Sequence, residues 1–343
     1  MKVLITHELF MPDFAGGGEK LAYEMAKNLQ KKGIEVKVLT TGNPKIKEFE
    51  GIQTIRLPIN RFLMNFAFFQ IIKHAKDVDI IQTSNYNACF PSWIAAKILK
   101  KPIFCFAFGL YGKRWLSMRG LIKGTFSRIV EKIQLNRGYT KNLFLSDYSK
   151  EWGLEIGIPE QRTEVINPGV SLENYKPLEK QPYVLFSGRF ANQKGVYDII
   201  KVAQLLPKIK FVMMGWGEEE QNLKKLAPNN IEFLNLSQKD GQKFFEMYSK
   251  ASVFFLPSYG ETFGFVLVEA MASGCPIVST VPLGYKGFVD KPGDISSMAE
   301  HINYLMNNPE ESKKLGQENI QLSKKYTWEN FTDKLISLYQ KTA

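Results

Sequence analysis

The chain has few cysteines and few histidines, with three of each among 343 residues. The cysteines are Cys89, Cys105 and Cys275. Their odd number and apolar surroundings exclude a disulfide framework and indicate reduced thiols in the core. The histidines, His7, His74 and His301, form no metal-like cluster in the sequence. We therefore expect no metal site and no cofactor.

Long apolar runs are also missing. No segment reaches the roughly 18 apolar residues that a helix needs to cross a bilayer. The first six residues, MKVLIT, lead directly into a predicted strand, and no apolar signal-peptide core follows them. These features favour a cytoplasmic location.

Acidic residues are scarce in the first half of the chain, where residues 1–172 hold 25 Lys or Arg against 15 Asp or Glu. The remainder holds 20 against 19, so the net charge of +11 lies almost wholly in the first half. Residues 113–141 carry eight basic residues and only Glu131. Apolar residues recur there at helical spacing, at Trp115, Met118, Ile122, Phe126, Ile129 and Ile133. Residues 61–73 are rich in aromatics.

Basic helices with apolar faces bind anionic lipid headgroups, so we expect the protein to lie on the inner face of the cell membrane through its N-terminal half. The alternative is that the apolar stripe packs on a sheet while its lysines and arginines extend to water. Nucleic acid is the other usual partner of a basic surface. Because the sequence contains no recognised nucleic-acid-binding motif, we expect no such partner.

Strand-like and helix-like segments alternate throughout, which predicts an α/β fold of two domains. A strand at residues 2–6 leads to the glycines 16–18 and then to a helix with Leu21, Met25 and Leu29 on one face. Residues 171–182 carry charges and prolines without periodicity, which indicates a domain boundary. The first domain then spans residues 1–172 and the second residues 173–325.

Two carboxylates stand eight positions apart in residues 257–278, a segment that reads as the end of a strand, a loop, a helix and a strand. Glu261 is expected in the loop and Glu269 in the helix. We expect the first turn of this helix to offer the backbone amides of Phe263, Gly264 and Phe265 to a phosphate. Carboxylates accept hydrogen bonds from vicinal hydroxyls, so the segment predicts a nucleotide-sugar site. The alternative is a buried helix whose two acids are solvated or capping.

A second motif, SGRFANQKG at residues 187–195, occupies a predicted strand-to-helix turn. Doubly wound folds bind their ligands at such turns. Gly188 permits a tight turn, and Arg189 and Lys194 place two cations where a diphosphate would bind. A surface turn with two solvated charges is the alternative. A third turn, FVMMGWGEE at residues 211–219, has Gly215 and Gly217 at a strand end.

Together these motifs resemble those of the retaining glycosyltransferases of the large family four, also called glycosyl transferases group 1. The resemblance implies the GT-B fold, in which two Rossmann-like doubly wound domains face each other across a cleft. It also implies an N-terminal domain that binds the acceptor, onto which a C-terminal helix at about residues 326–343 returns.

The same resemblance assigns roles to individual residues. Arg189 and Lys194 would hold the donor diphosphate, Glu261 would contact the transferred sugar and Glu269 the ribose. Donor contacts are further implied at Gly16, Gly17, Gly188, Gly215, Thr262, Phe263 and Gly264.

The implied reaction is that of a retaining, metal-independent hexosyltransferase. It would move a sugar from a UDP- or GDP-sugar to a hydroxyl of a lipid-linked or glycan acceptor, in glycolipid or surface-polysaccharide synthesis. Attack by the acceptor would come from the face of the leaving diphosphate.

Two departures from the family pattern keep other functions open. Phe108 stands where many members have a histidine that approaches the transferred sugar, and phenylalanine makes no conventional hydrogen bond. Residues 278–294 lack part of the usual loop after the second glutamate. The alternatives are a protein of the same fold that binds a nucleotide sugar without turnover, and an epimerase or phosphorylase.

Asp77 and Asp79 form a D-x-D sequence, which we interpret as the junction of a helix and a strand.

Overall fold

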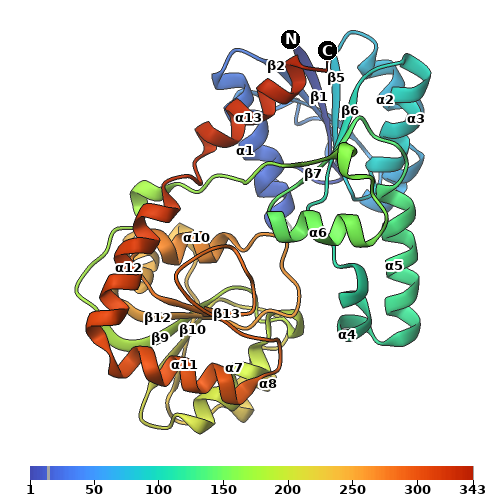
Figure 1. Cartoon of the computed structure of the whole chain (residues 1–343). Coiled ribbons are helices and arrows are strands. Elements are labelled where there is room, and N and C mark those ends of the chain that lie inside the picture. Colours follow the sequence, from blue (N-terminus) through green and yellow to red (C-terminus); the bar gives the residue numbers. More distant parts are fainter. Residues whose placement is uncertain (14–15, 343) are drawn as a thin grey trace. The chain divides into compact units, whose positions relative to one another are not determined.

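The computed structural model in Figure 1 describes residues 1–13 and 16–342 and divides into two compact units. Unit 1 comprises Met1–Trp115, Ile122–Gly169 and Trp328–Ala343, and unit 2 comprises Leu116–Leu121 and Val170–Thr327. The sequence predicted that the first domain ends at residue 172. In the structure, unit 1 gives way to unit 2 after Gly169, three residues earlier. The assignment of Leu116–Leu121 to unit 2 was not predicted from the sequence.

Unit 1 is built on an eight-stranded sheet with the strand order β3-β4-β2-β1-β5-β6-β7-β8. Its strands are β1 (Lys2–Thr6), β2 (Glu35–Thr41), β3 (Glu48–Phe49), β4 (Ile52–Leu57), β5 (Ile80–Ser84), β6 (Ile103–Phe106), β7 (Lys141–Phe144) and β8 (Thr163–Val165). All neighbouring strands are parallel except β3 and β4. The predicted α/β class is therefore confirmed for this unit.

Helices cover both faces of this sheet, as a parallel sheet with two apolar faces requires. They are α1 (Gly17–Lys31), α2 (Phe68–Ala75), α3 (Cys89–Leu99), α6 (Asp147–Glu155) and α13 (Trp328–Gln340), whereas α5 (Leu121–Leu135) is largely exposed. Figure 1 shows α1 and α13 on one side of the strands and α2 and α3 on the other. The predicted helix face of Leu21, Met25 and Leu29 is buried.

The C-terminal helix α13 is fixed to unit 1 by buried aromatic side chains. The ring of Phe331 stacks on Phe106 with 5.8 Å between the centroids. Tyr339 is fully buried, and its hydroxyl donates to Oε1 of Gln82 on β5 at 2.7 Å. This bond satisfies a side-chain oxygen in the middle of the sheet, so α13 is an integral part of the unit 1 core.

The basic segment 113–141 forms two helices rather than one. Helix α4 (Trp115–Arg119) ends at Gly120, whose φ is +74°, and α5 begins directly after it. Ile122 and Phe126 on α5 are 87 % and 69 % exposed. Ile129 and Ile133, which continue the same face, are also exposed. The part of the stripe that lies on α5 therefore does not pack on the sheet.

The single acid of this segment faces inward. Glu131 is buried and accepts hydrogen bonds from the backbone N–H groups of Tyr111 and Gly112, at 3.0 and 2.8 Å, and from Nε1 of Trp115 at 3.0 Å. Burial raises the pKa of Glu131, while these three hydrogen bonds act in the opposite direction. The carboxylate thus fastens the turn before α4 onto α5, and no acid remains on the exposed face of α5.

Unit 2 has a six-stranded parallel sheet with the order β11-β10-β9-β12-β13-β14. Its strands are β9 (Gln181–Ser187), β10 (Lys210–Met214), β11 (Ile231–Leu234), β12 (Ala251–Leu256), β13 (Ile277–Ser279) and β14 (Gly287–Val289). Its helices are α7 (Val196–Leu205), α8 (Glu220–Leu226), α9 (Gln242–Lys250), α10 (Phe265–Ala272), α11 (Ile295–Asn307) and α12 (Pro309–Ser323). Figure 1 shows α10 on one face of this sheet and α7 and α11 on the other.

Each sheet reverses its strand order at one place. In unit 1 the reversal lies between β1 and β5, and in unit 2 it lies between β9 and β12. Open α/β sheets bind their ligands outside the carboxyl ends of the two strands at such a reversal, a place that we call the crevice of each unit. The two crevices are therefore the first places to look for functional side chains.

The buried bond of Tyr339 yields a test of the role of α13. We expect Tyr339→Phe to destabilise the protein by about 1–3 kcal/mol, because Oε1 of Gln82 loses its donor inside the core. The matched variant Tyr304→Phe alters an exposed tyrosine and should change stability by less than about 0.5 kcal/mol. Calorimetric Tm values of both variants would decide, and equal shifts would contradict the assignment.

Candidate active site

The crevice of unit 2 brings together two side chains that the sequence singled out. Lys194 ends a short 3-10 turn (Asn192–Lys194) after β9, and Glu261 lies in the loop after β12. Nζ of Lys194 forms an ion pair with Oε2 of Glu261. Their side chains are 22 % and 16 % exposed, so the pair is largely enclosed but still reached by solvent.

The backbones of these two loops are in direct contact. Gly195 has a φ of +69°, and a Cβ atom at this position would lie 2.0 Å from the carbonyl oxygen of Pro257. The backbone N–H of Tyr259 donates to the carbonyl of Gln193 at 2.9 Å. The hydroxyl of Tyr259 donates to Oδ2 of buried Asp198 at 2.8 Å. These three contacts join the two loops and the start of α7, which fixes the position of the ion pair.

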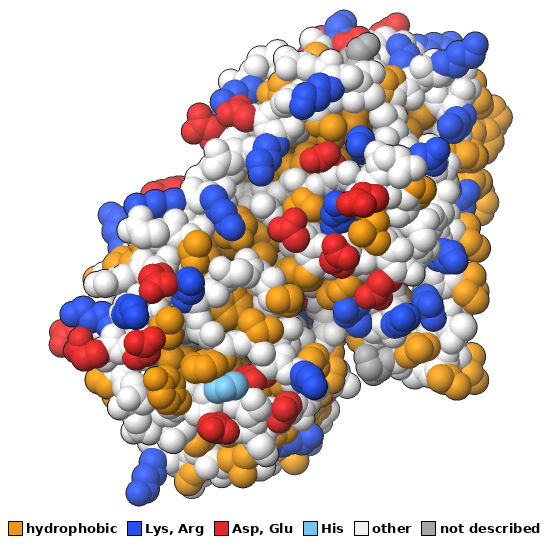
Figure 2. Space-filling view, in the orientation of Figure 1, with side chains coloured by type: hydrophobic (Ala, Val, Ile, Leu, Met, Phe, Trp, Pro, Cys, Tyr) orange, Lys and Arg blue, Asp and Glu red, His pale blue; other side chains and the backbone are white. Residues whose placement is uncertain are grey.

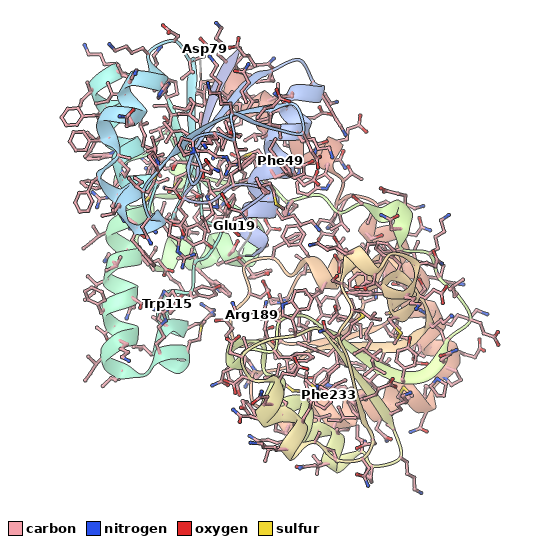
Figure 3. All side chains as sticks on the ribbon, turned by 180° about the vertical axis from the view of Figure 1, so that it is seen from behind. Glu19, Phe49, Asp79, Trp115, Arg189 and Phe233 are labelled. Carbon is pink, nitrogen blue, oxygen red and sulfur yellow. The ribbon has the colours of Figure 1, made fainter. Side chains whose placement is uncertain are left out.

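Arg189 is the second predicted cation of this site, and it lies at the surface of unit 2 (Figure 3). Its Nε donates to Oε2 of Glu218 at 3.0 Å, and both side chains are more than half exposed. The structure therefore places Arg189 and Lys194 on one loop but gives them different carboxylate partners. An exposed pair of this kind is weak, so Arg189 is available to a more strongly charged ligand.

Glu269 is buried in α10 and held by hydrogen bonds from neighbouring side chains. The hydroxyl of Tyr248 donates to its Oε2 at 2.7 Å, and Nε2 of Gln238 donates to its Oε1 at 3.1 Å. Burial raises the pKa of Tyr248 well above its ordinary value, so the phenol keeps its proton. The same Nε2 also donates to the hydroxyl of Tyr175 at 3.2 Å. The carboxylate is therefore fixed in orientation, and the sequence did not reveal these supporting residues.

The start of α10 differs from the prediction. The helix begins at Phe265, and Gly264 is its N-cap with a φ of +82°. Phe263 and Gly264 therefore precede the first turn, contrary to the sequence-based expectation. The ring of Phe263 is buried against Phe265 and Tyr326, at centroid distances of 5.2 and 5.6 Å, and Thr262 beside it is also buried.

The predicted glycines of unit 2 serve close contacts between backbones. A Cβ at Gly215 would lie 1.9 Å from the carbonyl oxygen of Gly188, and one at Gly217 would lie 2.4 Å from that of Phe190. Gly215 and Gly188 have φ values of +143° and +156°, which also favour glycine. These glycines join the turns after β9 and β10. The contact made by Gly215 in the structure is thus with a neighbouring loop of the protein.

The glycines of unit 1 lie at the start of α1. Gly16 is the N-cap with an extended φ of 175°, and Gly17 is the first helical residue, whereas the sequence placed both in a loop. A Cβ at Gly17 would meet no atom within 4 Å. Two further residues of this predicted loop, 14 and 15, are outside the described part of the chain.

The sequence did not reveal the polar side chains at the crevice of unit 1. His7 and Glu8 follow β1 directly, Asn87 follows β5, and Glu19 lies in the first turn of α1. The signal that could have found them is their position, because polar residues directly after buried parallel strands face the ligand-binding edge of a sheet.

Comparison with known proteins identifies the family. Residues 172–322 match the model "Glycosyl transferases group 1", and residues 15–174 match the model "Glycosyltransferase Family 4". An uncharacterised glycosyltransferase from Methanocaldococcus jannaschii is 26 % identical over 99 % of this chain and 98 % of its own length. A phosphatidyl-myo-inositol mannosyltransferase from Mycobacterium leprae is 23 % identical over 96 % and 94 %.

Solved structures of glycosyltransferases have the same fold as this chain. Sucrose-phosphate synthase from Thermosynechococcus elongatus superimposes with a TM-score of 0.83, at 19 % identity, over 99 % of this chain and 98 % of that chain. The Anabaena protein HepE in complex with UDP-glucose gives a TM-score of 0.78, at 18 % identity, over 99 % and 100 %. The chain is a glycosyltransferase of family four with the GT-B fold.

The described parts of this glycosyltransferase contain no cluster of metal-ligating side chains. Among residues 1–13 and 16–342, no three His, Cys, Asp or Glu side chains come together in a way that could hold a metal ion. Asp79 of the D-x-D sequence accepts a hydrogen bond from the backbone N–H of Lys2 at 2.7 Å, so it joins the starts of β5 and β1.

Among residues 1–13 and 16–342, no helix combines the length and the apolar character that crossing a membrane requires.

Phe108, for which the resemblance implied a histidine in many family members, follows β6. Its ring is buried and lies 5.7 Å from the imidazole of His7, centroid to centroid. His7, which follows β1, is therefore the histidine that lies beside Phe108. Burial lowers the pKa of His7 to about 4, so the imidazole is neutral at physiological pH.

The depressed pKa of His7 predicts how stability depends on pH. An unfolded imidazole titrates near 6.5, whereas the folded one titrates at about 4. Below pH 6.5 the unfolded chain binds more protons, so the contribution of His7 is complete above that pH and is lost as the pH falls toward 4. We expect this loss to reach about 3 kcal/mol. The variant His7→Gln should show a correspondingly flatter fall of Tm between pH 6.5 and 4, and equal slopes would contradict the prediction.

Proposed function

We propose that this glycosyltransferase moves a sugar from a nucleoside diphosphate donor to a hydroxyl acceptor, with retention of the anomeric configuration and without a metal ion. The observation that carries the proposal is the enclosed Lys194–Glu261 pair at the crevice of unit 2. A cation and a carboxylate side by side match a ligand in which a diphosphate adjoins sugar hydroxyls.

Each charged group has a defined task in this proposal. Lys194 and Arg189 neutralise the charge that develops on the leaving diphosphate, which a metal does in other enzymes. Glu261 accepts hydrogen bonds from the hydroxyls of the transferred sugar and holds the Lys194 ammonium in place. Glu269, fixed by Tyr248 and Gln238, accepts the hydroxyls of the ribose. Positioning and electrostatics thus supply the catalysis.

The proposed reaction exchanges one bond at the anomeric carbon for another. The bond to the diphosphate oxygen breaks, and the bond to the acceptor oxygen forms on the same face of the ring. The proton of the acceptor hydroxyl passes to the leaving phosphate oxygen. No enzyme nucleophile is required, and the positive charge on the sugar is matched by the negative charge of the departing diphosphate.

The comparisons support a sugar nucleotide donor and a glycolipid or glycan acceptor. The structurally similar HepE was solved with UDP-glucose, which favours a UDP-sugar over a GDP-sugar. The mannosyltransferase relative is named for a phosphatidyl-inositol acceptor. We infer that the acceptor here is lipid-linked or part of a surface glycan.

A membrane-bound acceptor fits the surface of unit 1. The exposed stripe of α5, here Ile122, Phe126, Ile129 and Ile133, is flanked by Arg128 and Lys132. Phe62, Phe66 and Phe69 are also exposed, beside an apolar groove of about 390 Å³. Figure 2 shows hydrophobic side chains along the edge of unit 1 that carries α2, α3 and α5. We infer that this face lies on the anionic inner leaflet of the cell membrane.

The donor site is tested by two substitutions. Lys194→Ala and Glu261→Gln should each lower kcat by about 10²–10³-fold, the effect of losing one preorganised charge at a transition state. Lys225→Ala removes an exposed lysine of α8 and should leave turnover unchanged. The assay is mass spectrometry of donor loss and product with a panel of UDP- and GDP-sugars in EDTA.

Three results of this assay would contradict the proposal. Near-normal turnover in both variants would remove the assigned roles. Product formation that stops in EDTA would remove metal independence. Donor binding without consumption by the wild type, over the whole acceptor panel, would favour the binding protein that the buried Phe108 keeps open as an alternative.

Membrane binding is tested by the double variant Ile122→Ser/Phe126→Ser. Each side chain contributes about 1.5–3 kcal/mol when it is buried, so we expect vesicle binding to weaken by at least about tenfold. Co-sedimentation with phosphatidylglycerol-containing vesicles measures this, and pure phosphatidylcholine vesicles should bind weakly. The exposed Leu205 of unit 2 provides the control, Leu205→Ser, whose binding should equal that of the wild type. Equal loss in both variants would argue against the α5 face.

A further inference from the structure

The turn after β10 carries an exposed indole at the carboxyl edge of the unit 2 sheet. Trp216 lies between Gly215 and Gly217 and is 52 % exposed. The other four tryptophans of the chain are buried or half-buried, at Trp93, Trp115, Trp152 and Trp328. Tryptophan side chains are highly buried on average, and exposed ones are frequent anchors of binding surfaces. The position of Trp216 at a ligand-binding edge therefore indicates a contact with a ligand.

The backbone that carries this indole is held from both sides. The N–H of Phe190, in the turn after β9, donates to the carbonyl of Trp216 at 2.8 Å, and the N–H of Glu219 donates to the carbonyl of Phe190 at 3.1 Å. The N–H of Gly215 donates to the carbonyl of Leu234, at the end of β11, at 2.8 Å. A ligand that contacts the indole therefore has to order little more than its two side-chain torsions.

The turn lies among the groups that the proposed function assigns to the donor. Strand β10 stands between β9 and β11 in the sheet. On the β9 side, Arg189 pairs with Glu218, which is two residues after Trp216. On the β11 side, Gln238 follows the strand and donates to Glu269, the proposed ribose carboxylate. Trp216 thus belongs to the part of the edge between the proposed diphosphate cations and the residue that orients the ribose carboxylate.

One part of a nucleoside diphosphate donor has no partner among these groups. The diphosphate, the ribose and the transferred sugar each have an assigned charged side chain, whereas the base is planar, aromatic and uncharged. An indole presents a π face to such a ring, and bases stack on aromatic side chains in many nucleotide-binding proteins.

The apolar face of the transferred sugar is the other group that an indole could cover. Its proposed carboxylate, Glu261, follows β12, which lies on the opposite side of β9 from β10. The strand order therefore directs the transferred sugar away from Trp216 and leaves the base on its side.

We propose that the indole of Trp216 stacks on the nucleobase of the donor. The inference rests on the proposed function, because it requires a nucleoside diphosphate at the crevice of unit 2. The family resemblance implied a donor contact at Gly215 and none at Trp216. Trp216 is thus a further donor-binding residue of this chain.

Stacking adds affinity without selecting the base. Every base has a π face, so uracil and guanine both fit against the indole. Trp216 therefore strengthens the binding of UDP and of GDP and contributes nothing to the binding of pyrophosphate, which has no base.

Tryptophan fluorescence reports on this contact directly. Saturating UDP or GDP should quench the emission of the wild-type protein, and pyrophosphate should not. The quenching should vanish in Trp216→Phe, because the four remaining tryptophans lie elsewhere, and should persist in Trp93→Phe, which removes a half-buried tryptophan of unit 1. Since a phenyl ring still stacks, Trp216→Phe should keep the UDP affinity within about fivefold of the wild type.

Calorimetric titration of Trp216→Ala measures what the ring contributes. The affinity for UDP and for GDP should fall by about tenfold or more, while the affinity for pyrophosphate and the Tm stay at the wild-type values. Leu226→Ala, at an exposed position of α8, is the control and should bind UDP like the wild type. An equal loss of UDP and pyrophosphate affinity in Trp216→Ala would show damage to the turn and overturn the stacking role.

Failure of this inference can be told apart from failure of the proposed function. If Trp216→Ala binds UDP and GDP like the wild type while Lys194→Ala does not, the stacking is overturned and the donor site stands. Quenching by neutral methyl glycosides without a nucleotide would assign the indole to a sugar and overturn the base contact. If the wild type binds neither UDP nor GDP, the proposed function fails, and the inference fails with it.

Discussion

The candidate site of unit 2 depends on a contact between backbones that only glycine permits. At Gly195 a side chain would overlap the carbonyl oxygen of Pro257, and the positive φ disfavours any other residue. Gly215 meets Gly188 in the same way on the next strand. Because the turns after β9, β10 and β12 touch, the charges they carry are fixed by the sheet itself. Lys194 therefore reaches Glu261 without the large entropic cost of ordering two free loops.

The crevice of unit 1 is organised by burial instead of by close backbone contact. Parallel strands covered on both faces leave their polar groups at the carboxyl ends, where His7, Glu8 and Asn87 gather. In this enclosed position the imidazole loses its charge, while Glu8 is held by hydrogen bonds from Asn87. The two crevices thus differ in chemistry. Unit 2 presents cations paired with carboxylates, and unit 1 presents a neutral base among acids.

Local sequence patterns predicted what depends on neighbours along the chain. The alternation of strands and helices, the turn with Arg189 and Lys194, and the loop position of Glu261 all follow from segments of about twenty residues. What the patterns missed depends on distant residues. Tyr248 and Gln238 support Glu269 from α9 and the turn before it, and no spacing rule connects them. The N-terminal end of α10 was misplaced because the positive φ of Gly264, which delays the helix, depends on the loop.

The stripe of α5 shows a second limit of sequence patterns, because apolar residues at helical spacing look the same on a buried face and an exposed one. Because Glu131 is buried, the only acid of the segment points inward, and apolar and basic side chains remain on the surface. The segment therefore separates its charges by depth, with cations on the exposed side of α5 and its one carboxylate inside. Cationic side chains beside exposed apolar ones are what the proposed contact with an anionic membrane requires.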